Sequence, residues 1–297
     1  MKIRAAIVGY GNIGRFTLEA LEAAPDFEVA GIVRRDPSKR DGIPSDIPVV
    51  GSIKELEKVD VAILATPTRE VEKHAVEILN LGINTVDSFD IHTSIGELRK
   101  HLDKVAKENS RVSVIAAGWD PGSDSVVRTL MEAIAPKGVT YTNFGPGMSM
   151  GHSVAVRSKE GVREALSVTI PTGTGIHRRM VYVELLPGHT LEEVTKAIKA
   201  DPYFSSDETH VFAVESVDAL KDMGHGVNLV RKGVSGKTQN QLLEFDMKIN
   251  NPALTGQVLV CVARASMRLA AGCYTMIEIP VVDLLPGDRD AWINRLV

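Results

Sequence analysis

Two acidic residues stand at positions where a substrate amine could be held. Asp90 lies in the segment VDSFD and Asp120 in AAGWDPG. Each follows a short segment, Ile83–Val86 and Val112–Ala116 respectively, that is predicted to form a strand. Ligands of open α/β sheets bind just beyond the carboxyl ends of parallel strands. We therefore expect the two carboxylates to converge on one crevice, where they would attract an ammonium group.

Both acids also have ordinary structural explanations. Asp120 begins the sequence Asp-Pro-Gly, which forms turns by itself, and Asp90 can cap a helix. The aromatic neighbours Phe89 and Trp119 could wall a site and exclude water from it. Position alone leaves the functional and the structural interpretation open for each acid.

A glycine-rich turn near the start of the chain has the spacing that binds a dinucleotide. The segment Gly9–Gly14 has the pattern G-x-G-x-x-G, follows the apolar run Ile3–Val8 and opens a predicted helix over Ile13–Ala24. In such a turn the first glycine permits the tight bend, and the second lets the backbone approach the pyrophosphate. The third lets the helix pack on the strand. The helix start adds free N–H groups for the phosphates.

The residues after the second strand indicate which dinucleotide is bound. Where an NAD-selective site places an acid, at the end of the strand Glu28–Val33, this chain has Arg34 and Arg35. Two guanidinium groups suit a 2′-phosphate, so the predicted cofactor is NADP. The alternative is that Asp36 binds the ribose of NAD and the arginines are solvated. The segment Thr66-Pro67-Thr68 follows the third strand and is expected to line the nucleotide crevice.

The elements that position these residues alternate between strands and helices over the first ~115 residues, which predicts a doubly wound parallel sheet. Further predicted strands cover Asp60–Ala65, Ile83–Val86 and Val112–Ala116, and further helices cover Glu70–Asn80 and Ile95–Asn109. We expect residues 1–120 to form a Rossmann-type dinucleotide-binding domain, completed by about 253–297. That tail is predicted as a helix over Ala253–Ala271, closed by Gly272, and a strand over Tyr274–Pro280.

After Asp120 the pattern changes to strands, which predicts a second α+β domain of mixed or antiparallel sheet over residues 121–252. This domain is expected to bind the substrate and to mediate dimerisation. A helix is predicted over Ser125–Ala135, and the strands that follow are interrupted by a single predicted helix, Leu191–Lys199. The predicted strands are Val139–Phe144, Ala165–Pro171, Met180–Leu186, Gly226–Val234 and Leu242–Ile249.

Composition limits the partners. The 297 residues carry 34 Lys and Arg against 38 Asp and Glu, a formal charge of −4, so nothing favours nucleic acid or an anionic membrane as a partner. The longest apolar runs are far too short to span a bilayer. Two cysteines, without metal-ligand neighbours, indicate neither a disulfide framework nor a metal site. We expect a cytoplasmic enzyme.

Six segments together resemble the meso-diaminopimelate dehydrogenases, a family of short NADP-dependent amino-acid dehydrogenases. The resemblance runs in order over nearly the whole chain, and FGPGMSMGHS (Phe144–Ser153) and GWDPG are far more specific than the glycine turn. The segments are VGYGNIGR, VRRDP, VDSFD, AAGWDPG, FGPGMSMGHS and INNP. The resemblance implies oxidation of the D-centre of meso-2,6-diaminopimelate to L-2-amino-6-oxopimelate and ammonia. It also implies a homodimer or a larger homo-oligomer.

The resemblance also assigns residues to roles. Around the reacting amino centre it implies Asp90, Asp120 and Trp119. Bordering the substrate, with Gly151 offering backbone N–H groups to a carboxylate, it implies Phe144, Ser149, Met150 and Gly151. For the distal, L-configured end it implies Thr169, Arg179, His225 and Asn251. For the cofactor it implies Gly9, Tyr10, Gly11, Asn12, Ile13, Gly14, Arg34, Arg35, Thr66, Pro67, Thr68, Ser88 and Phe89.

Three alternatives remain at this point. Because Phe144 stands where some relatives have Trp, a more permissive pocket could accept other D-amino acids. Another two-domain NAD(P) oxidoreductase, such as a dihydrodipicolinate reductase, would share the first domain but not the motifs of the second. A non-catalytic dinucleotide sensor would need neither the paired acids nor Arg179. The residues do not decide whether Asp90, Asp120 or a water is the general base.

Overall fold

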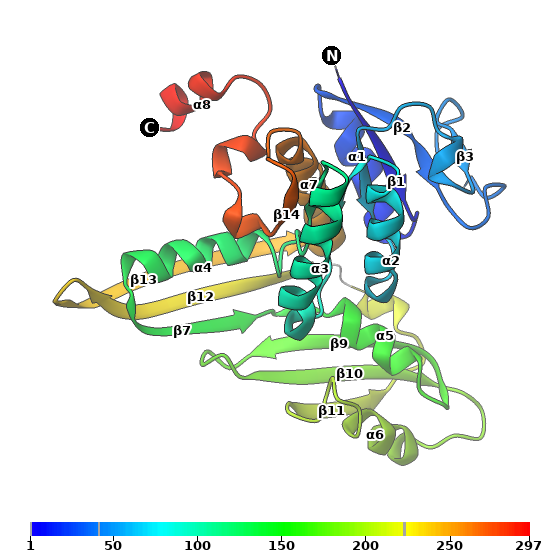
Figure 1. The fold of residues 1–297 in the computed structure, drawn as a ribbon. Coiled ribbons are helices and arrows are strands. Elements are labelled where there is room, and N and C mark those ends of the chain that lie inside the picture. Colours follow the sequence, from blue (N-terminus) through cyan, green and yellow to red (C-terminus); the bar gives the residue numbers. More distant parts are fainter. Residues whose placement is uncertain (1, 41, 222–223) are drawn as a thin grey trace. The chain divides into compact units, whose positions relative to one another are not determined.

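The computed structural model describes residues 2–40, 42–221 and 224–297, which fold into two compact units (Figure 1). The first unit combines Met1–Thr129 with Pro252–Val297, and the second is the continuous segment Leu130–Asn251. No helix among these described residues is long and apolar enough to cross a membrane.

The first unit is built on a seven-stranded sheet of order β14-β6-β5-β4-β1-β2-β3, in which every neighbouring pair is parallel. Every side chain of the central strands β4 and β5 is buried, as expected for a sheet covered on both faces; those of β4 are all apolar, whereas β5 also buries Asn84, Thr85 and Asp87. The strands are β1 (Ile3–Val8), β2 (Phe27–Val33), β3 (Val49–Val50), β4 (Val61–Leu64), β5 (Asn84–Asp87), β6 (Val112–Val114) and β14 (Gly272–Tyr274).

Helices cover both faces of this sheet. Side chains of α1 (Asn12–Ala23) and α7 (Asn251–Ser266) share one apolar core with the strands. Those of α2 (Thr68–Leu79) and α3 (Ile95–Glu108) form the core on the opposite face. The predicted Rossmann-type fold is therefore confirmed, and β1 lies between β2 and β4, where the strand order reverses.

The end of the chain differs from its prediction. The helix expected over Ala253–Ala271 ends at Ser266, and Gly272 is the first residue of a strand rather than the residue that closes the helix. The strand expected over Tyr274–Pro280 ends at Tyr274 and is followed by a 3₁₀ turn at Met276–Glu278. The capping box of Thr275 and Glu278 explains the difference, because it holds that turn within an otherwise apolar, strand-like sequence. A terminal helix, α8 (Arg289–Leu296), was not expected.

The second unit contains two sheets. One has the order β11-β10-β9-β8 and mixes a parallel β10–β11 pair with antiparallel pairs, and the other is the antiparallel sheet β13-β12-β7. Its strands are β7 (Lys137–Phe144), β8 (Gly147–Met148), β9 (Val162–Pro171), β10 (His177–Leu185), β11 (Glu208–Ala213), β12 (Gly224–Ser235) and β13 (Thr238–Asn250). The predicted α+β class of mixed sheet is confirmed.

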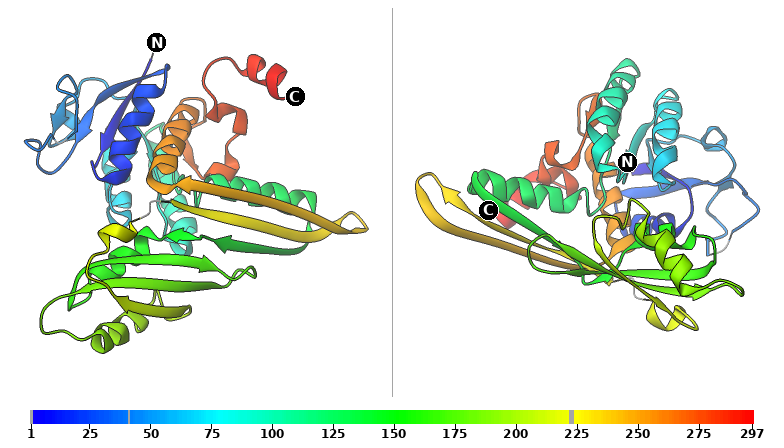
Figure 2. Two further views of the ribbon diagram at one scale, coloured as in Figure 1. Left: turned by 180° about the vertical axis from the view of Figure 1, so that it is seen from behind. Right: turned by 90° about the horizontal axis from the view of Figure 1, so that it is seen from below.

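Two helices cover one face of the four-stranded sheet, where the prediction had one (Figure 2). Leu191–Lys199 forms α6, as predicted, and Met150–Arg157 forms the additional α5. Apolar side chains of both pack on β9 and β10 around the buried Phe204. The segment of α5 was missed because its eight residues begin with Met-Gly-His-Ser, which gives little helical periodicity. The helix α4 (Ser123–Ile134) runs from the first unit into the second.

Candidate active site

The glycine turn fits a pyrophosphate. Gly9 has φ +94°, and a Cβ there would lie 2.6 Å from the Ala65 carbonyl oxygen. A Cβ on Gly14 would lie 2.4 Å from the Gly9 oxygen, so these two glycines are required by the fold itself. A Cβ on Gly11 would meet nothing within 4 Å. That open space lies at the start of α1, whose first turn has no side-chain cap and so offers N–H groups to an anion.

The two arginines after β2 lie on the surface. Arg34 donates to the Lys39 carbonyl and its guanidinium stands 5.9 Å from the Tyr10 ring centroid. Arg35 forms an ion pair with Glu70 and is 85% exposed, so it can exchange that partner for a phosphate. Asp36, the alternative ribose ligand, accepts hydrogen bonds from the backbone and the hydroxyl of Ser38, which hold its pKa below the usual range.

The loop after β4 links the cofactor segment to one of the two acids. The Thr68 hydroxyl donates to Asp90 Oδ1 at 2.6 Å. The Thr66 hydroxyl is buried and has no hydrogen-bond partner among the described residues. A buried polar group without a partner costs free energy, so this hydroxyl is suited to a ligand. Pro67, between them, precedes the first residue of α2.

Asp90 and Asp120 follow adjacent parallel strands, β5 and β6, and one buried residue ties the two strand ends together. Asp87 Oδ1 accepts the backbone N–H groups of Phe89 and Ala116, and its carbonyl accepts that of Ala117. Ser88 lies within this bend. Complete burial raises the pKa of Asp87 to about 7, and its Oδ2 has no partner among the described residues.

Asp120 has a buried acidic neighbour. Asp124, in the first turn of α4, has a side chain that is 0% exposed, and Arg128 Nη2 lies 2.5 Å from its Oδ2 and 3.4 Å from Asp120 Oδ1. Burial first, and then the charge of Asp120, raise the pKa of Asp124 to about 7, while Arg128 acts in the opposite direction. Trp119 is buried, and its carbonyl accepts the Asp124 N–H.

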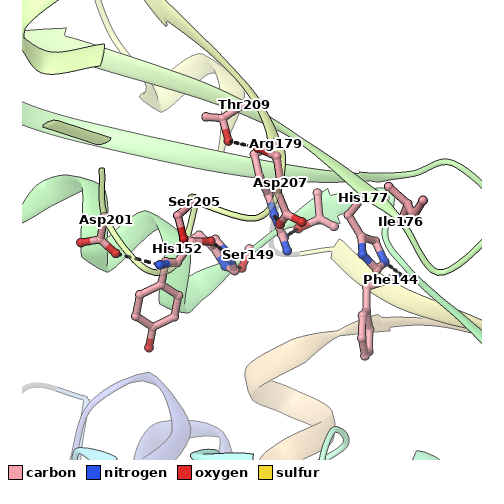
Figure 3. Close-up of polar contacts among 12 residues, drawn as sticks. Phe144, Ser149, His152, Ile176, His177, Arg179, Asp201, Ser205, Asp207 and Thr209 are labelled. Carbon is pink, nitrogen blue, oxygen red and sulfur yellow. Dashed lines mark hydrogen bonds and ion pairs between the residues drawn. The ribbon is translucent and has the colours of Figure 1, made fainter. Parts of the chain in front are cut away.

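In the second unit, Arg179 stands between the hydroxyl of Thr169 and the carboxylate of Asp207, and Figure 3 labels Arg179 and Asp207. It lies opposite Thr169 in the β9–β10 ladder, and its Nη1 donates to the Thr169 hydroxyl. Its Nε forms an ion pair with Asp207 Oδ2 at 2.6 Å. The side chain is only 12% exposed, so this guanidinium is fixed in direction rather than solvated.

Two histidines near Arg179 are held in their neutral form. Burial, followed by the charge of Arg179, lowers the pKa of His152 to about 4 and also lowers that of His177. His152 Nδ1 lies 2.7 Å from the Ser149 hydroxyl, and His177 Nε2 accepts the backbone N–H of Phe144 (Figure 3). Arg179 therefore carries the positive charge of this group of residues, with Asp207 as its counterion.

The remaining predicted substrate residues also belong to the second unit. Met150 and Gly151 are the first two residues of α5, whose N–H groups have no intrahelical acceptor. His225 lies in β12 rather than in the loop suggested by its flanking glycines, and it interacts electrostatically with His152. Asn251 is the first residue of α7 and directly follows β13.

Four neighbours of the predicted residues were not predicted from the sequence: Asp87, Asp124, His152 and Asp207. The i,i+4 spacing of Asp124 and Arg128 within a predicted helix was an available signal. Asp87 lies in the VDSFD segment but reads as the last residue of a strand. Asp207 is 28 residues from Arg179 and lies in a serine-rich turn, so no local pattern connects the two.

Chemically, the first unit offers a dinucleotide turn and two acids, and the second offers a guanidinium, hydroxyls, neutral imidazoles and a helix start. Acids bind ammonium groups, and the second set binds carboxylates. The described residues contain no cluster of side chains able to hold a metal ion. The residues of the first unit therefore favour an amine, and those of the second favour a carboxylate.

Comparison with known proteins covers both units. A family model described as an oxidoreductase family with an NAD-binding Rossmann fold matches residues 3–116, and the diaminopimelic acid dehydrogenase C-terminal domain matches residues 118–251. The chain is 71% identical to a meso-diaminopimelate D-dehydrogenase of Bacteroides fragilis, over 100% of this chain and 99% of the relative. Among solved structures, C. glutamicum DAP dehydrogenase in complex with DAP has a TM-score of 0.90 at 28% identity, covering 100% of this chain and 99% of the other. An engineered D-amino acid dehydrogenase bound to NADP+ has a TM-score of 0.85 at 27% identity, covering 100% of both chains.

Proposed function

The chain belongs to the meso-diaminopimelate dehydrogenase family, and from this membership we propose that it oxidises the D-configured amino centre of meso-2,6-diaminopimelate. The products are L-2-amino-6-oxopimelate, which cyclises to tetrahydrodipicolinate, and ammonia, and the reverse reaction serves lysine biosynthesis. The observation that carries this proposal is the 71% identity over the full length of a relative with that activity.

We propose that NADP is held by the glycine turn, by Arg34 and Arg35, and by the loop after β4. Bound there, NADP accepts the hydride. The open space at Gly11 admits the pyrophosphate, and the exposed Arg35 meets the 2′-phosphate. Tyr10, Asn12, Ile13, Ser88 and Phe89 complete the proposed contacts, together with Thr66, Pro67 and Thr68.

The reacting amine is proposed to lie against Asp90 and Asp120, with Trp119 excluding water. An ammonium group must lose a proton before its carbon can release hydride, and a carboxylate can take that proton directly or through water. The same carboxylates then stabilise the positive iminium carbon until water adds to it. The Thr68 hydroxyl fixes the direction of Asp90 in this arrangement.

The distal, L-configured end is proposed to bind Thr169, Arg179, His225 and Asn251. Arg179 is held in place by Thr169 and Asp207 through Nη1 and Nε, and we assign its Nη2 to the distal carboxylate. Asn251 offers a carbonyl oxygen to the distal amine. We propose that these contacts hold the distal end in one orientation and thereby select one of the two amino centres for oxidation. Phe144, Ser149, Met150 and Gly151 are proposed to border the chain of the substrate.

Turnover tests the function. The protein is mixed with NADP and either meso-diaminopimelate, L,L-diaminopimelate or D-alanine, and reduced cofactor is followed by absorbance. The proposal predicts strong turnover of the meso isomer and none of L,L-diaminopimelate. Equal kcat/KM for D-alanine and the meso isomer would instead establish a general D-amino-acid dehydrogenase, like the engineered structural relative.

We also propose a homodimer that works in the cytoplasm. The edge strand β13 presents alternate half-buried apolar side chains on one face, which is typical of a surface that a second copy covers. These side chains are Leu243, Phe245, Met247 and Ile249. Light scattering should give twice the chain mass, and Phe245→Glu should give a monomer. Both cysteines are free thiols, as expected in a reducing compartment.

A further inference from the structure

We propose that Asp124 acts through Asp120 as the second half of a proton-sharing carboxyl pair, and that this pair accepts the proton released by the D-ammonium of the substrate. Asp124 is then a positioning residue, since only Asp120 faces the amine. The inference rests on the proposed function, because it requires the reacting amine to lie next to Asp120.

The geometry of the pair is fixed by α4 and the loop before it. The Asp124 side chain is completely buried, whereas that of Asp120 is 13% exposed. Arg128 Nη2 contacts one oxygen of each acid, at 2.5 Å and 3.4 Å, and thereby holds the two carboxyls side by side. The same guanidinium nitrogen therefore lies against both acids, and each carboxyl lies within reach of the charge of the other.

The charges around Asp124 explain why the pair holds a proton. The charged groups that face it are Asp120, from the loop after β6, and Arg128, one turn further along α4; Ser125 adds a hydroxyl. Burial and the Asp120 charge raise the pKa of Asp124 to about 7. Because the carboxyls share the proton, it belongs to the pair. One guanidinium can balance one negative charge but not two.

The proton balance follows directly. Above pH 7 the pair carries two negative charges, and it gains one proton when the substrate N–H bond breaks and an O–H bond forms on Asp120. The proton is then shared with Asp124, and the amine is left neutral for hydride loss. No electrons move in this step. A lone aspartate with an ordinary pKa is a poor acceptor at neutral pH, whereas a pair that binds a proton near pH 7 is matched to the task.

The ordinary explanation of Asp124 is an i,i+4 ion pair that stabilises α4. It predicts that removal of the carboxyl changes stability alone. Asp103 and Lys107 form an equivalent i,i+4 pair on α3, with Nζ 2.7 Å from Oδ2, and therefore supply a matched control.

The test is the pH profile of kcat/KM for oxidation of meso-diaminopimelate from pH 5.5 to 9.5, measured on the wild type, Asp124→Asn and Asp103→Asn. In the wild type we expect kcat/KM to fall as the pH drops below about 7, and we call this fall the acid limb. In Asp124→Asn the acid limb should move to a pH at least about one unit lower. The kcat of this variant should fall by about 100-fold, as expected when a general base of suitable pKa is lost. Asp103→Asn should keep both features.

A second readout uses binding rather than turnover. Calorimetry of substrate binding to each protein with NADPH, in buffers of different ionisation enthalpy at pH 7.5, counts the protons exchanged with the buffer. The transferred proton comes from the substrate, so the buffer receives only the fraction of a proton that the free pair already holds near pH 7; the wild type and Asp103→Asn should release the same fraction, and Asp124→Asn less. An unchanged limb and unchanged proton release in Asp124→Asn would overturn the inference. A wild type without an inflexion between pH 6 and 8 would overturn it even if the variant failed to fold. Absence of any turnover by the wild type would instead overturn the proposed function.

Discussion

Arg179 and Thr169 lie opposite each other on neighbouring antiparallel strands, and the guanidinium Nη1 donates to the threonine hydroxyl. Asp207 holds the Nε of the same guanidinium, so Arg179 points in one direction before any substrate arrives. A guanidinium prepared in this way loses little entropy when it binds a carboxylate.

Arg179→Ala should therefore weaken the binding of meso-diaminopimelate much more than that of a monocarboxylic D-amino acid. We expect KM for the meso substrate to rise by about 100-fold, the value of a charge-assisted hydrogen bond to a buried guanidinium, and KM for D-alanine to change by less than about 3-fold. Arg178→Ala is the control, because Arg178 pairs with Glu208 and points to the other face of the sheet. Equal losses for both substrates would contradict the role in binding the distal carboxylate.

The second prediction separates the glycines of the turn. Gly11→Ala should raise the Kd of NADP at least about 10-fold because its Cβ enters the pyrophosphate space, yet Tm should change little since the Cβ meets no protein atom. Gly14→Ala should instead lower Tm, because its Cβ would meet the Gly9 oxygen. Cofactor fluorescence titration and thermal unfolding measure the two effects. Similar Tm losses in both variants would contradict the assignment.

The third prediction concerns Arg34 and Arg35 and the choice between NADP and NAD. Replacement of both by alanine should weaken NADP binding by about 10- to 100-fold through loss of charge-assisted bonds to the 2′-phosphate. NAD binding should stay unchanged and serves as the internal control. If the double variant weakened both cofactors equally, Asp36 would become the residue to test next on the ribose.

The fourth prediction concerns Asp87 and the way in which the free energy of unfolding depends on pH. Its pKa is raised to about 7 in the fold, so the folded chain holds this proton where the unfolded chain has lost it. The contribution of protonated Asp87 to the free energy of unfolding is therefore fully present below the pKa that this aspartate has in the unfolded chain. It is lost as pH rises through about 7, the pKa in the folded chain. Asp87→Asn removes this dependence. The free energy of unfolding of the variant relative to the wild type should thus increase by about 2 kcal/mol between pH 5 and pH 8.

Urea unfolding at the two pH values measures this difference. Asp103→Asn is the matched control, since the ion pair with Lys107 lowers the pKa of Asp103 and reverses the sign. Asp103→Asn should lower the free energy of unfolding at both pH values, because both lie above the pKa of an aspartate in the unfolded chain. A constant difference between Asp87→Asn and the wild type from pH 5 to pH 8 would rule out a proton on Asp87.

The sequence predicted the parts of the fold that depend on local pattern. The parallel strands and their helices are short, strongly apolar or strongly periodic segments, and their boundaries agree within a few residues. What was missed was short or decided by distant contacts. The two-residue β3 pairs with β2, and β11 aligns with β10 although its sequence alternates only weakly.

The candidate site shows the same limit. Position at strand ends was enough to single out Asp90 and Asp120, because strand ends of a parallel sheet are predictable. The partners that set their chemistry were not. Asp87 reads as a buried strand end, and Asp207 reaches Arg179 only through the pairing of β10 with β11. The residues of the distal end came from family resemblance rather than from pattern.

The path of the chain through the two units has a consequence for biosynthesis. The edge strand β14 joins β6 only after residue 272 has been made, whereas every strand of the second unit precedes residue 251. The whole second unit is therefore synthesised before the last strand of the nucleotide-binding sheet. A chain that stopped after residue 251 would contain every strand of the second unit but would lack α7 and β14 of the first.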